Sequence, residues 1–319
     1  ARLLHAMTTN HVQDLKPGDS CYLFFLNAQG RILGDAQVLC FEDSFLIDTE
    51  PETRRSLYDH LDRYIIADDV ALEDVTDSVV SFAVEGPRAE QVLAAAGAPI
   101  PATPGAWSDW SGCTVARIDT TGAAGFRLFT TPERRDQILA TLALPPATAE
   151  DARTVRIEHA KPRYGEEITD RYLVQEPGQL HAVHFSKGCY LGQETVARID
   201  ALGHVNRRLV AVAMAAGREH RAGTEVTADG QLAGRLTSLC FSPSLGRVIG
   251  LGLLQVKALD AGRPLAVDGE AVEVVEDVDR GAALNLKAVS SVVRFDFSID
   301  VAGVNAEGIT LRYQIADVG

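Results

Sequence analysis

Residues 21–41 have the sequence CYLFFLNAQGRILGDAQVLCF. Two runs in this stretch, Cys21 to Leu26 and Arg31 to Phe41, have the apolar composition typical of β-strands. The four residues between them, Asn27 to Gly30, end on a glycine, which supplies the positive φ that short hairpin loops need. The stretch therefore predicts an antiparallel hairpin.

Short strands and helices are expected to alternate around this hairpin. Residues 1–16 have the spacing of an amphipathic helix, and a strand over Ser44 to Thr49 precedes a helix from about Pro51 to Ile65. The strands show alternation of polar and apolar residues rather than continuous apolar runs. We therefore expect an antiparallel α+β architecture and not a doubly wound parallel sheet.

The pattern changes after Asn206, where short strands alternate with glycine-rich turns, as in small β-barrels. We expect an α+β domain of one or two lobes over residues 1–205 and a C-terminal β-barrel over residues 206–278. Residues 279–319 are expected to form an extra tail. Two amphipathic strands of that tail, joined by Ala302 to Gly308, predict a β-hairpin of unassigned role.

Charge and cysteine content exclude several classes of protein. The 319 residues carry a formal net charge of −14, which disfavours direct binding to nucleic acid or to anionic lipid. The cysteines number five and none forms a C-x-x-C pair, so neither a zinc ribbon nor a disulfide framework is expected. No apolar stretch reaches the length of a membrane span and no signal-peptide pattern is present, so the sequence predicts a cytoplasmic protein without a membrane partner.

The octapeptide Lys187-Gly188-Cys189-Tyr190-Leu191-Gly192-Gln193-Glu194 places a thiol among glycines. In an extended segment Lys187 and Cys189 would share one face, and a nearby ammonium would favour the reactive thiolate. Glu194 and Arg198 stand four residues apart and would pair on a following helix. A lone cysteine is more often a small buried apolar residue, and that alternative stays open here.

This octapeptide resembles the K-G-C-Y-x-G-Q-E signature of the YgfZ family of folate-binding proteins, which is related to the aminomethyltransferase (T-protein) of the glycine cleavage system. The resemblance covers about residues 1–278. Further similar segments are Met7 to Asn10, Leu26 to Ile32, Arg156 to Gly165 and Gly234 to Arg247. It implies a ring of small α+β lobes plus a β-barrel around a central tetrahydrofolate site.

The resemblance also implies roles for individual residues. Glu176 takes the position of the glutamate that binds the pterin in the transferases, where a carboxylate can accept two N–H donors. The transferases carry an Asp-Asp pair where this chain has Gly34-Asp35, so Asp35 alone remains as a candidate for proton transfer. The other candidate cofactor-binding residues are Asn27, Arg31, Tyr164, Gly188, Tyr190, Gln193, Glu194 and Arg198.

Three functions are compatible with these residues. The first is a tetrahydrofolate-binding accessory protein that supports assembly or repair of Fe–S clusters in client enzymes, including tRNA-modifying ones, with Cys189 as functional thiol and Lys187 tuning it. The second is a tetrahydrofolate-dependent aminomethyl- or methyltransferase that uses Asp35 and Glu176, with Cys189 secondary. The third is a non-catalytic binding scaffold. The cofactor is tetrahydrofolate or a one-carbon derivative in the first two, and Fe–S client or assembly proteins are the expected partners in the first.

His181 and His184 lack a third ligand at a convincing spacing, so no metal site is predicted.

Overall fold

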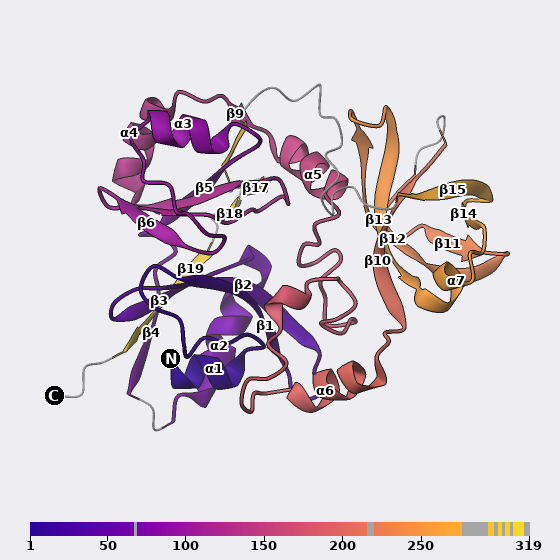
Figure 1. Cartoon of the computed structure of the whole chain (residues 1–319), viewed down its shortest axis with the longest axis horizontal. Coiled ribbons are helices and arrows are strands. Elements are labelled where there is room, and N and C mark those ends of the chain that lie inside the picture. Colours follow the sequence, from indigo (N-terminus) through magenta and orange to yellow (C-terminus); the bar gives the residue numbers. More distant parts are fainter. Residues whose placement is uncertain are drawn as a thin grey trace.

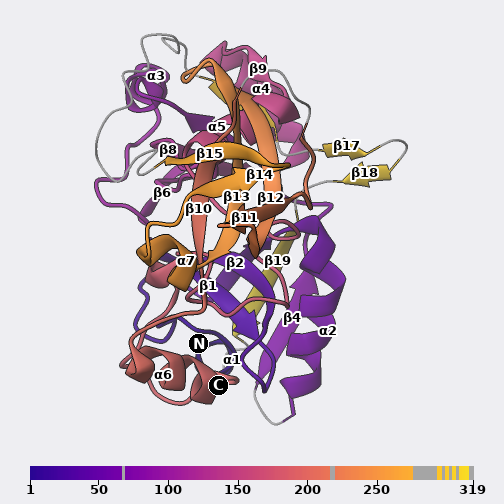
Figure 2. The same cartoon turned by 90° about the vertical axis from the view of Figure 1, so that its right-hand side faces the viewer.

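A computed structural model gives the structure of this chain. It describes residues 1–66, 69–215 and 220–275, together with the backbone of four strands between residues 293 and 315. Two α+β lobes lie one above the other on one side of the molecule, and a β-barrel lies on the other (Figure 1). The barrel faces the viewer in Figure 2, and α6 (Gln193–Leu202) lies below it in both views. The α+β expectation is thereby confirmed.

The first lobe is an antiparallel sheet in the order β1-β2-β3-β19-β4. Its strands are β1 (Ser20–Leu26), β2 (Ile32–Cys40), β3 (Ser44–Thr49), β4 (Val70–Asp74) and β19 (Ile309–Ile315). The hairpin of β1 and β2 and the helix α2 (Arg54–Tyr64) occur where the sequence predicts them. Helices α1 (Arg2–Met7) and α2 bury Met7, Leu57 and Leu61 against one face of this sheet.

The N-terminal helix is shorter than predicted. It ends at Met7, and Thr8 is extended and forms a bridge with Phe25 of β1. The amide of Thr9 donates to the carbonyl of Phe24. The helix predicted for residues 1–16 is therefore wrong from Thr8 onward. Backbone groups of Thr8 and Thr9 pair with β1 and not with a preceding helical turn.

The second lobe is a sheet in the order β6-β7-β8-β5-β16-β9. Its strands are β5 (Val80–Glu85), β6 (Trp107–Trp110), β7 (Cys113–Ala116), β8 (Gly125–Thr130), β9 (Pro146–Ala147) and β16 (Val293–Asp296). Helices α3 (Ala89–Ala95) and α4 (Pro132–Leu142) pack on it around Phe82, Val84 and Leu128.

The barrel is closed in the order β10-β13-β12-β11-β14-β15. Its strands are β10 (Arg207–Ala213), β11 (Glu225–Ala228), β12 (Gln231–Ser242), β13 (Arg247–Gln255), β14 (Leu265–Val267) and β15 (Glu270–Val275), with α7 (Val256–Asp260) at one end. Helix α5 (Ala149–Glu158) contacts β12 and β13 and so connects the barrel to the lobes. The predicted C-terminal barrel is confirmed.

The strands of the terminal segment do not pair as one hairpin. β16 joins the second lobe beside β5, whereas β19 lies between β3 and β4 of the first lobe. Among the described strands of this segment, the short β17 (Ile299–Val301) and β18 (Val304–Ala306) pair with each other. A strand at the edge of a sheet has backbone N–H and C=O groups that lack partners. In this chain β16 pairs with β5 of the second lobe, and β19 pairs with β3 and β4 of the first.

Candidate functional site

Both faces of the β1–β2 hairpin are covered, and the face turned away from α1 and α2 carries polar groups. Phe24 pairs with Asp35 across the hairpin, and Tyr22 lies two residues before Phe24. Alternate residues of a strand share a face, so all three side chains point the same way. This face packs against the segment that contains Tyr164 and Val174.

Asp35 is the buried carboxylate of this face. The Tyr22 hydroxyl donates to its Oδ2 at 2.5 Å, while its Oδ1 is buried and has no hydrogen-bond partner in the part of the chain that the structure describes. Burial, followed by the charge of Glu50, raises the pKa of Asp35 to about 7. A carboxyl group with such a pKa can give or take a proton near neutral pH.

Replacing Asp35 with asparagine is expected to change how stability depends on pH. The folded chain keeps a proton on Asp35 that the unfolded chain releases between pH values of about 4 and 7. The wild type should therefore lose stability relative to Asp35→Asn as the pH rises through that window, by about 2–4 kcal/mol, with no further change above it. Urea denaturation at several pH values measures this difference, and a difference that stays constant with pH would contradict the raised pKa.

Arg163 and Glu50 lie close enough to Asp35 to affect its charge, and Glu52 contacts the same arginine. Arg163 donates to Glu50 at 2.8 Å and to Glu52 at 3.1 Å. Burial raises the pKa of Glu50, and Arg163 opposes that change. Tyr164, the next residue, is part of the same apolar cluster as Tyr22, and burial, with smaller contributions from nearby carboxylates, raises the pKa of its hydroxyl.

Tyr22, Glu50 and Arg163 were not among the predicted site residues. A signal for Tyr22 was present, because the register of the predicted hairpin places it diagonally across from Asp35. Glu50 and Arg163 are 113 residues apart, and no local pattern connects them.

Glu176 is also buried, with 3% of its surface exposed. Its Oε2 accepts a hydrogen bond from the amide of Leu173, which closes the turn around it. Val174, two residues earlier, packs in the same cluster as Tyr22 and Tyr164. Glu176 and Asp35 thus both border one apolar cluster, and among the described residues no hydrogen bond joins them.

The octapeptide packs directly on the β1–β2 turn. Gly192 has a φ of +82°, and a Cβ there would lie 2.5 Å from the carbonyl oxygen of Asn27. A Cβ on Gly30 would lie 2.6 Å from the Cβ of Thr195 in α6. Two motifs that are distant in the sequence therefore touch through glycines, since only glycine permits so close an approach.

Gly192→Ala is expected to destabilise the protein by about 2–3 kcal/mol, because it combines a positive φ with a collision against backbone atoms. Gly188→Ala is the matched control in the same octapeptide, since a Cβ there meets nothing within 4 Å. Thermal melting of both variants checks the prediction. Equal melting temperatures of the two variants would contradict the prediction, because they would show that the backbone near Asn27 moves to accommodate the added methyl group without loss of stability.

The remaining turn and octapeptide residues have local structural partners. The Oδ1 of Asn27 accepts from the amides of Gln29 and Arg31, and Arg31 donates to the carbonyl of Arg171. The Oε1 of Gln193 accepts from the amide of Tyr190. Burial raises the pKa of Tyr190 to about 12, so this phenol stays protonated.

The structure corrects the predicted relation of Lys187 to Cys189. The Lys187 ammonium is half-buried and donates to the carbonyls of His5, Thr8 and Asn10 at 2.6, 2.7 and 2.6 Å. Cys189 is exposed to solvent. The two side chains do not share a face, because residues 187–190 form an irregular loop and not a strand. Lys187 therefore fastens the N-terminal segment to this loop.

Glu194 and Arg198 are both exposed on α6, and the described residues include no ion pair between them. His181 stacks on Tyr22 with ring centroids 5.5 Å apart, and the ring of His184 meets that of His11 at 5.1 Å. Within the described ranges no group of three or more His, Cys, Asp or Glu side chains is arranged to hold a metal ion. None of the helices described has both the length and the apolar composition needed to cross a membrane.

Comparison with known proteins identifies the family. A model of the GCVT N-terminal domain matches residues 1–187, and a model of the glycine cleavage T-protein C-terminal barrel domain matches residues 207–277. The chain belongs to the glycine cleavage T-protein family. The second match coincides with the closed barrel described above.

Relatives within the T-protein family have modest sequence identity to this chain. A protein of Arabidopsis thaliana named “Putative transferase At1g60990, chloroplastic” is 27% identical over 289 residues, which are 87% of this chain and 66% of that protein. The aminomethyltransferase of Geobacillus kaustophilus is 29% identical over 283 residues, covering 83% of this chain and 77% of the enzyme. The crystal structure of the glycine cleavage system aminomethyltransferase T from Bartonella henselae has the same fold, with a TM-score of 0.68 at 18% identity over 85% of this chain and 78% of that one.

Proposed function

We propose that this member of the T-protein family binds tetrahydrofolate or a one-carbon derivative on the face that carries Asp35, with Glu176 as a second acceptor, and acts as a YgfZ-type accessory protein for Fe–S enzymes. The observation that carries the accessory role is the tight packing at Gly34, next to Asp35. A Cβ on Gly34 would lie 2.9 Å from Cδ1 of Leu57 and 3.1 Å from Cγ2 of Thr53. A side chain at position 34 would therefore require Leu57 and Thr53 to shift, and this chain lacks the carboxylate pair expected of the transferases.

The residues of this face fit a reduced pterin. A pterin presents neighbouring N–H donors, and carboxylates are the acceptors that suit them. Asp35 has a buried oxygen without a partner in the described chain, and an unpaired buried acceptor costs about 1–3 kcal/mol. A donor on a ligand would remove that cost. When bound, tetrahydrofolate supplies the carrier nitrogens for a one-carbon unit, and the Asp35 carboxyl would hold or release a proton beside it.

Calorimetric titration with tetrahydrofolate tests the binding. Glu176→Gln and Asp35→Asn should each weaken binding about tenfold or more, because each replaces one carboxyl oxygen with an amide nitrogen whose N–H groups would face the N–H donors of the pterin. Glu225→Gln is the matched control, since Glu225 lies on the barrel surface in an ion pair with Arg235. If the wild type releases no heat and shows no thermal shift, the binding proposal fails and only the scaffold interpretation remains.

Cys189 supports the accessory role through its exposure, since an accessible thiol can meet a partner protein or its cluster. Cys189→Ala should lower the activity of client Fe–S enzymes under oxidative stress. Cys240→Ala is the control, because Cys240 is partly buried and its thiol donates to the carbonyl of Thr154. Full client activity with Cys189→Ala would remove Cys189 from the proposal.

A folate-dependent aminomethyltransferase is the second candidate. It is favoured by the names of several relatives and by the pKa of about 7 at Asp35. Formation of methylene-tetrahydrofolate from an aminomethyl donor, lost in Asp35→Ala, would establish that activity. Tetrahydrofolate binding without turnover would instead support the accessory function.

A further inference from the structure

Two carboxylates face each other across strands β2 and β3 of the first lobe. Glu50 follows β3 directly, and its φ of −67° and ψ of 145° continue the extended backbone of that strand. β2 and β3 pair Ala36 with Thr49, so the next step of this antiparallel register places Asp35 opposite Glu50. The Thr49 hydroxyl donates to the carbonyl of Asp35 at 2.6 Å, which holds the two segments together at this step. Residues opposite each other in a sheet have Cβ atoms about 5 Å apart, so the charge of Glu50 acts on Asp35.

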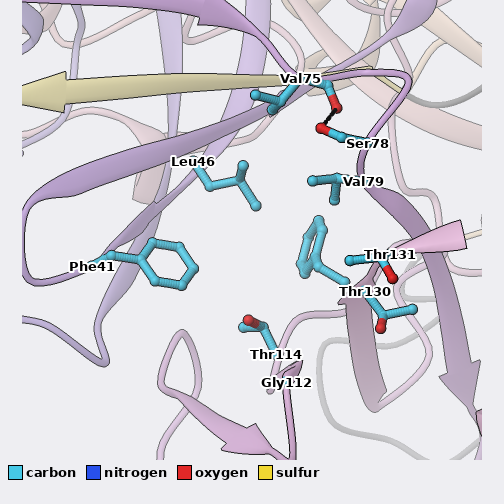
Figure 3. A pocket seen from close by; sticks show the side chains of 10 residues that line it. Phe41, Leu46, Val75, Ser78, Val79, Gly112, Thr114, Thr130 and Thr131 are labelled. Carbon is cyan, nitrogen blue, oxygen red and sulfur yellow. Dashed lines mark hydrogen bonds between the residues drawn. The ribbon is translucent and has the colours of Figure 1, made fainter. Parts of the chain in front are cut away.

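The acids of this face have two arginines as partners. Asp48, two residues before Glu50 on the same face, contacts Arg127 of β8 at 2.8 and 3.0 Å. Glu50 accepts from Arg163 at 2.8 Å. No guanidinium donates to Asp35 in the described ranges, and the pocket between the lobes, which β3 also borders, has no charged residue in its lining (Figure 3). Like charges so close together favour a proton on the acid that lacks an arginine, and that acid is Asp35.

A proton and a ligand would compete for the same atom of Asp35. Tyr22 donates its single hydroxyl hydrogen to Oδ2, and burial, followed by the charge of Asp35, raises the pKa of Tyr22 so that it stays a donor. Oδ1 is buried and has no partner among the described residues. A neutral carboxyl group with Oδ2 engaged in this way carries its hydrogen on Oδ1, where it opposes an N–H donor of a pterin. An N–H group can therefore bind at Oδ1 once the proton has left.

Groups from three segments set the charge of Asp35. The charged or titratable groups that face it in the described chain are Tyr22 of β1, Glu50, and Arg163 and Tyr164 in the segment after α5. Burial raises the pKa of Tyr164, so this phenol stays neutral as Tyr22 does. For the pKa of Asp35 the charge of Glu50 outweighs that of Arg163, and burial together with Glu50 gives a value of about 7.

We propose that Glu50 is a positioning residue of the folate site: its charge keeps a proton on Asp35 of the free protein, and tetrahydrofolate displaces that proton when it binds. This inference rests on the proposed folate site. On binding, the O–H bond of Asp35 breaks, the proton passes to the buffer, and Oδ1 accepts an N–H of the pterin. Glu50 acts on the ligand through Asp35. The affinity for tetrahydrofolate is therefore linked to pH, since the ionised fraction of Asp35 is the competent one.

Calorimetric titration of the full chain with tetrahydrofolate at two pH values tests the inference. From the pKa of about 7 at Asp35, the wild type should bind about 30-fold more weakly at about pH 5.5 than at about pH 8. Titrations at about pH 6 in phosphate and in Tris, whose ionisation enthalpies differ, should show release of about one proton per ligand.

Variants of the two glutamates that contact Arg163 separate Glu50 from a structural role. In Glu50→Gln the ratio of affinities should shrink to about tenfold or less, because loss of the negative charge lowers the pKa of Asp35. A structural role alone would weaken binding equally at both pH values. Glu52→Gln is the matched control, since Glu52 contacts the same arginine but does not contribute to the pKa of Asp35, and it should keep the wild-type ratio. Glu50→Asp keeps the charge and should also retain most of the pH dependence.

Each result decides between the inference and the folate site beneath it. Binding with equal affinity at both pH values, or without proton release, would overturn the inference and leave the folate site standing. An unchanged ratio in Glu50→Gln, or in Glu50→Ser if Glu50→Gln does not fold, would overturn the role of Glu50. Asp35→Asn should bind weakly and with no pH dependence, and a ratio like that of the wild type would assign the proton to another group. Absence of binding at every pH would contradict the folate site itself and the inference with it.

Discussion

Glu167→Ala is expected to lower the free energy of unfolding by about 3–5 kcal/mol, the range for removing one partner of a buried charged network. Glu167 has no exposed surface. Its Oε2 accepts from Nη1 of Arg156 at 2.8 Å and from the amide of Arg163 at 3.1 Å. Its Oε1 accepts from the hydroxyls of Thr237 and Ser238, both at 2.6 Å. The variant leaves the buried Arg156 guanidinium, the buried Ser238 hydroxyl and the half-buried Thr237 hydroxyl without this acceptor.

The network connects α5 with strand β12 of the barrel, so its loss should also loosen the barrel from the lobes. Urea denaturation of Glu167→Ala measures the effect on stability, and limited proteolysis after residue 205 measures the loosening. Glu225→Ala is the matched control, because its ion pair with Arg235 is exposed and should contribute about 0–1 kcal/mol. Similar urea midpoints for both variants would show that water replaces the missing acceptor.

Lys187→Met is expected to cost about 3–4 kcal/mol and to release the N-terminal segment. Methionine keeps the length of the side chain but leaves the carbonyls of His5, Thr8 and Asn10 without their shared donor. Each buried carbonyl that loses its partner costs about 1–3 kcal/mol, and part of this is recovered where water enters. Hydrogen exchange should therefore accelerate at residues 8–10 and at the amide of His184, which donates to Thr9.

Lys16→Met is the control for Lys187→Met, because Lys16 is exposed and its substitution should change stability very little. The rate of thiol labelling at Cys189 provides a second readout under native conditions. The structure predicts that this rate changes little, since the ammonium donates its hydrogen bonds to carbonyls of the N-terminal segment. A large drop in labelling at constant stability would restore the role of Lys187 in tuning Cys189.

Patterns within a single element predicted much of the fold. The hairpin of residues 21–41 follows from alternation and from Gly30, and the barrel follows from short strands separated by glycine-rich turns. The N-terminal helix was predicted too long because Thr8 and Asn10 bond to residues more than 170 positions away. The terminal strands were predicted to pair with each other, yet they join two different sheets.

The candidate site was predicted in part. Asp35 and Glu176 were found through resemblance, and both are buried carboxylates near the cluster of Tyr22 and Tyr164. The surroundings of Asp35 were not predicted, because Glu50 and Arg163 come from distant parts of the chain. The octapeptide was singled out for its cysteine, whereas five of its other seven residues make packing contacts or hydrogen bonds within the fold.

The sequence by itself determined the α+β class, the C-terminal barrel and the identity of the motifs, because strand alternation and glycine turns are properties of neighbouring residues. Only the tertiary structure decided which way each functional side chain points. Gly192 and Gly30 allow the octapeptide to contact the β1–β2 turn. Lys187 donates hydrogen bonds to carbonyls of the N-terminal segment, whereas Cys189 is exposed to solvent. Such contacts depend on which backbone groups remain unpaired after folding, and that is a property of the whole chain.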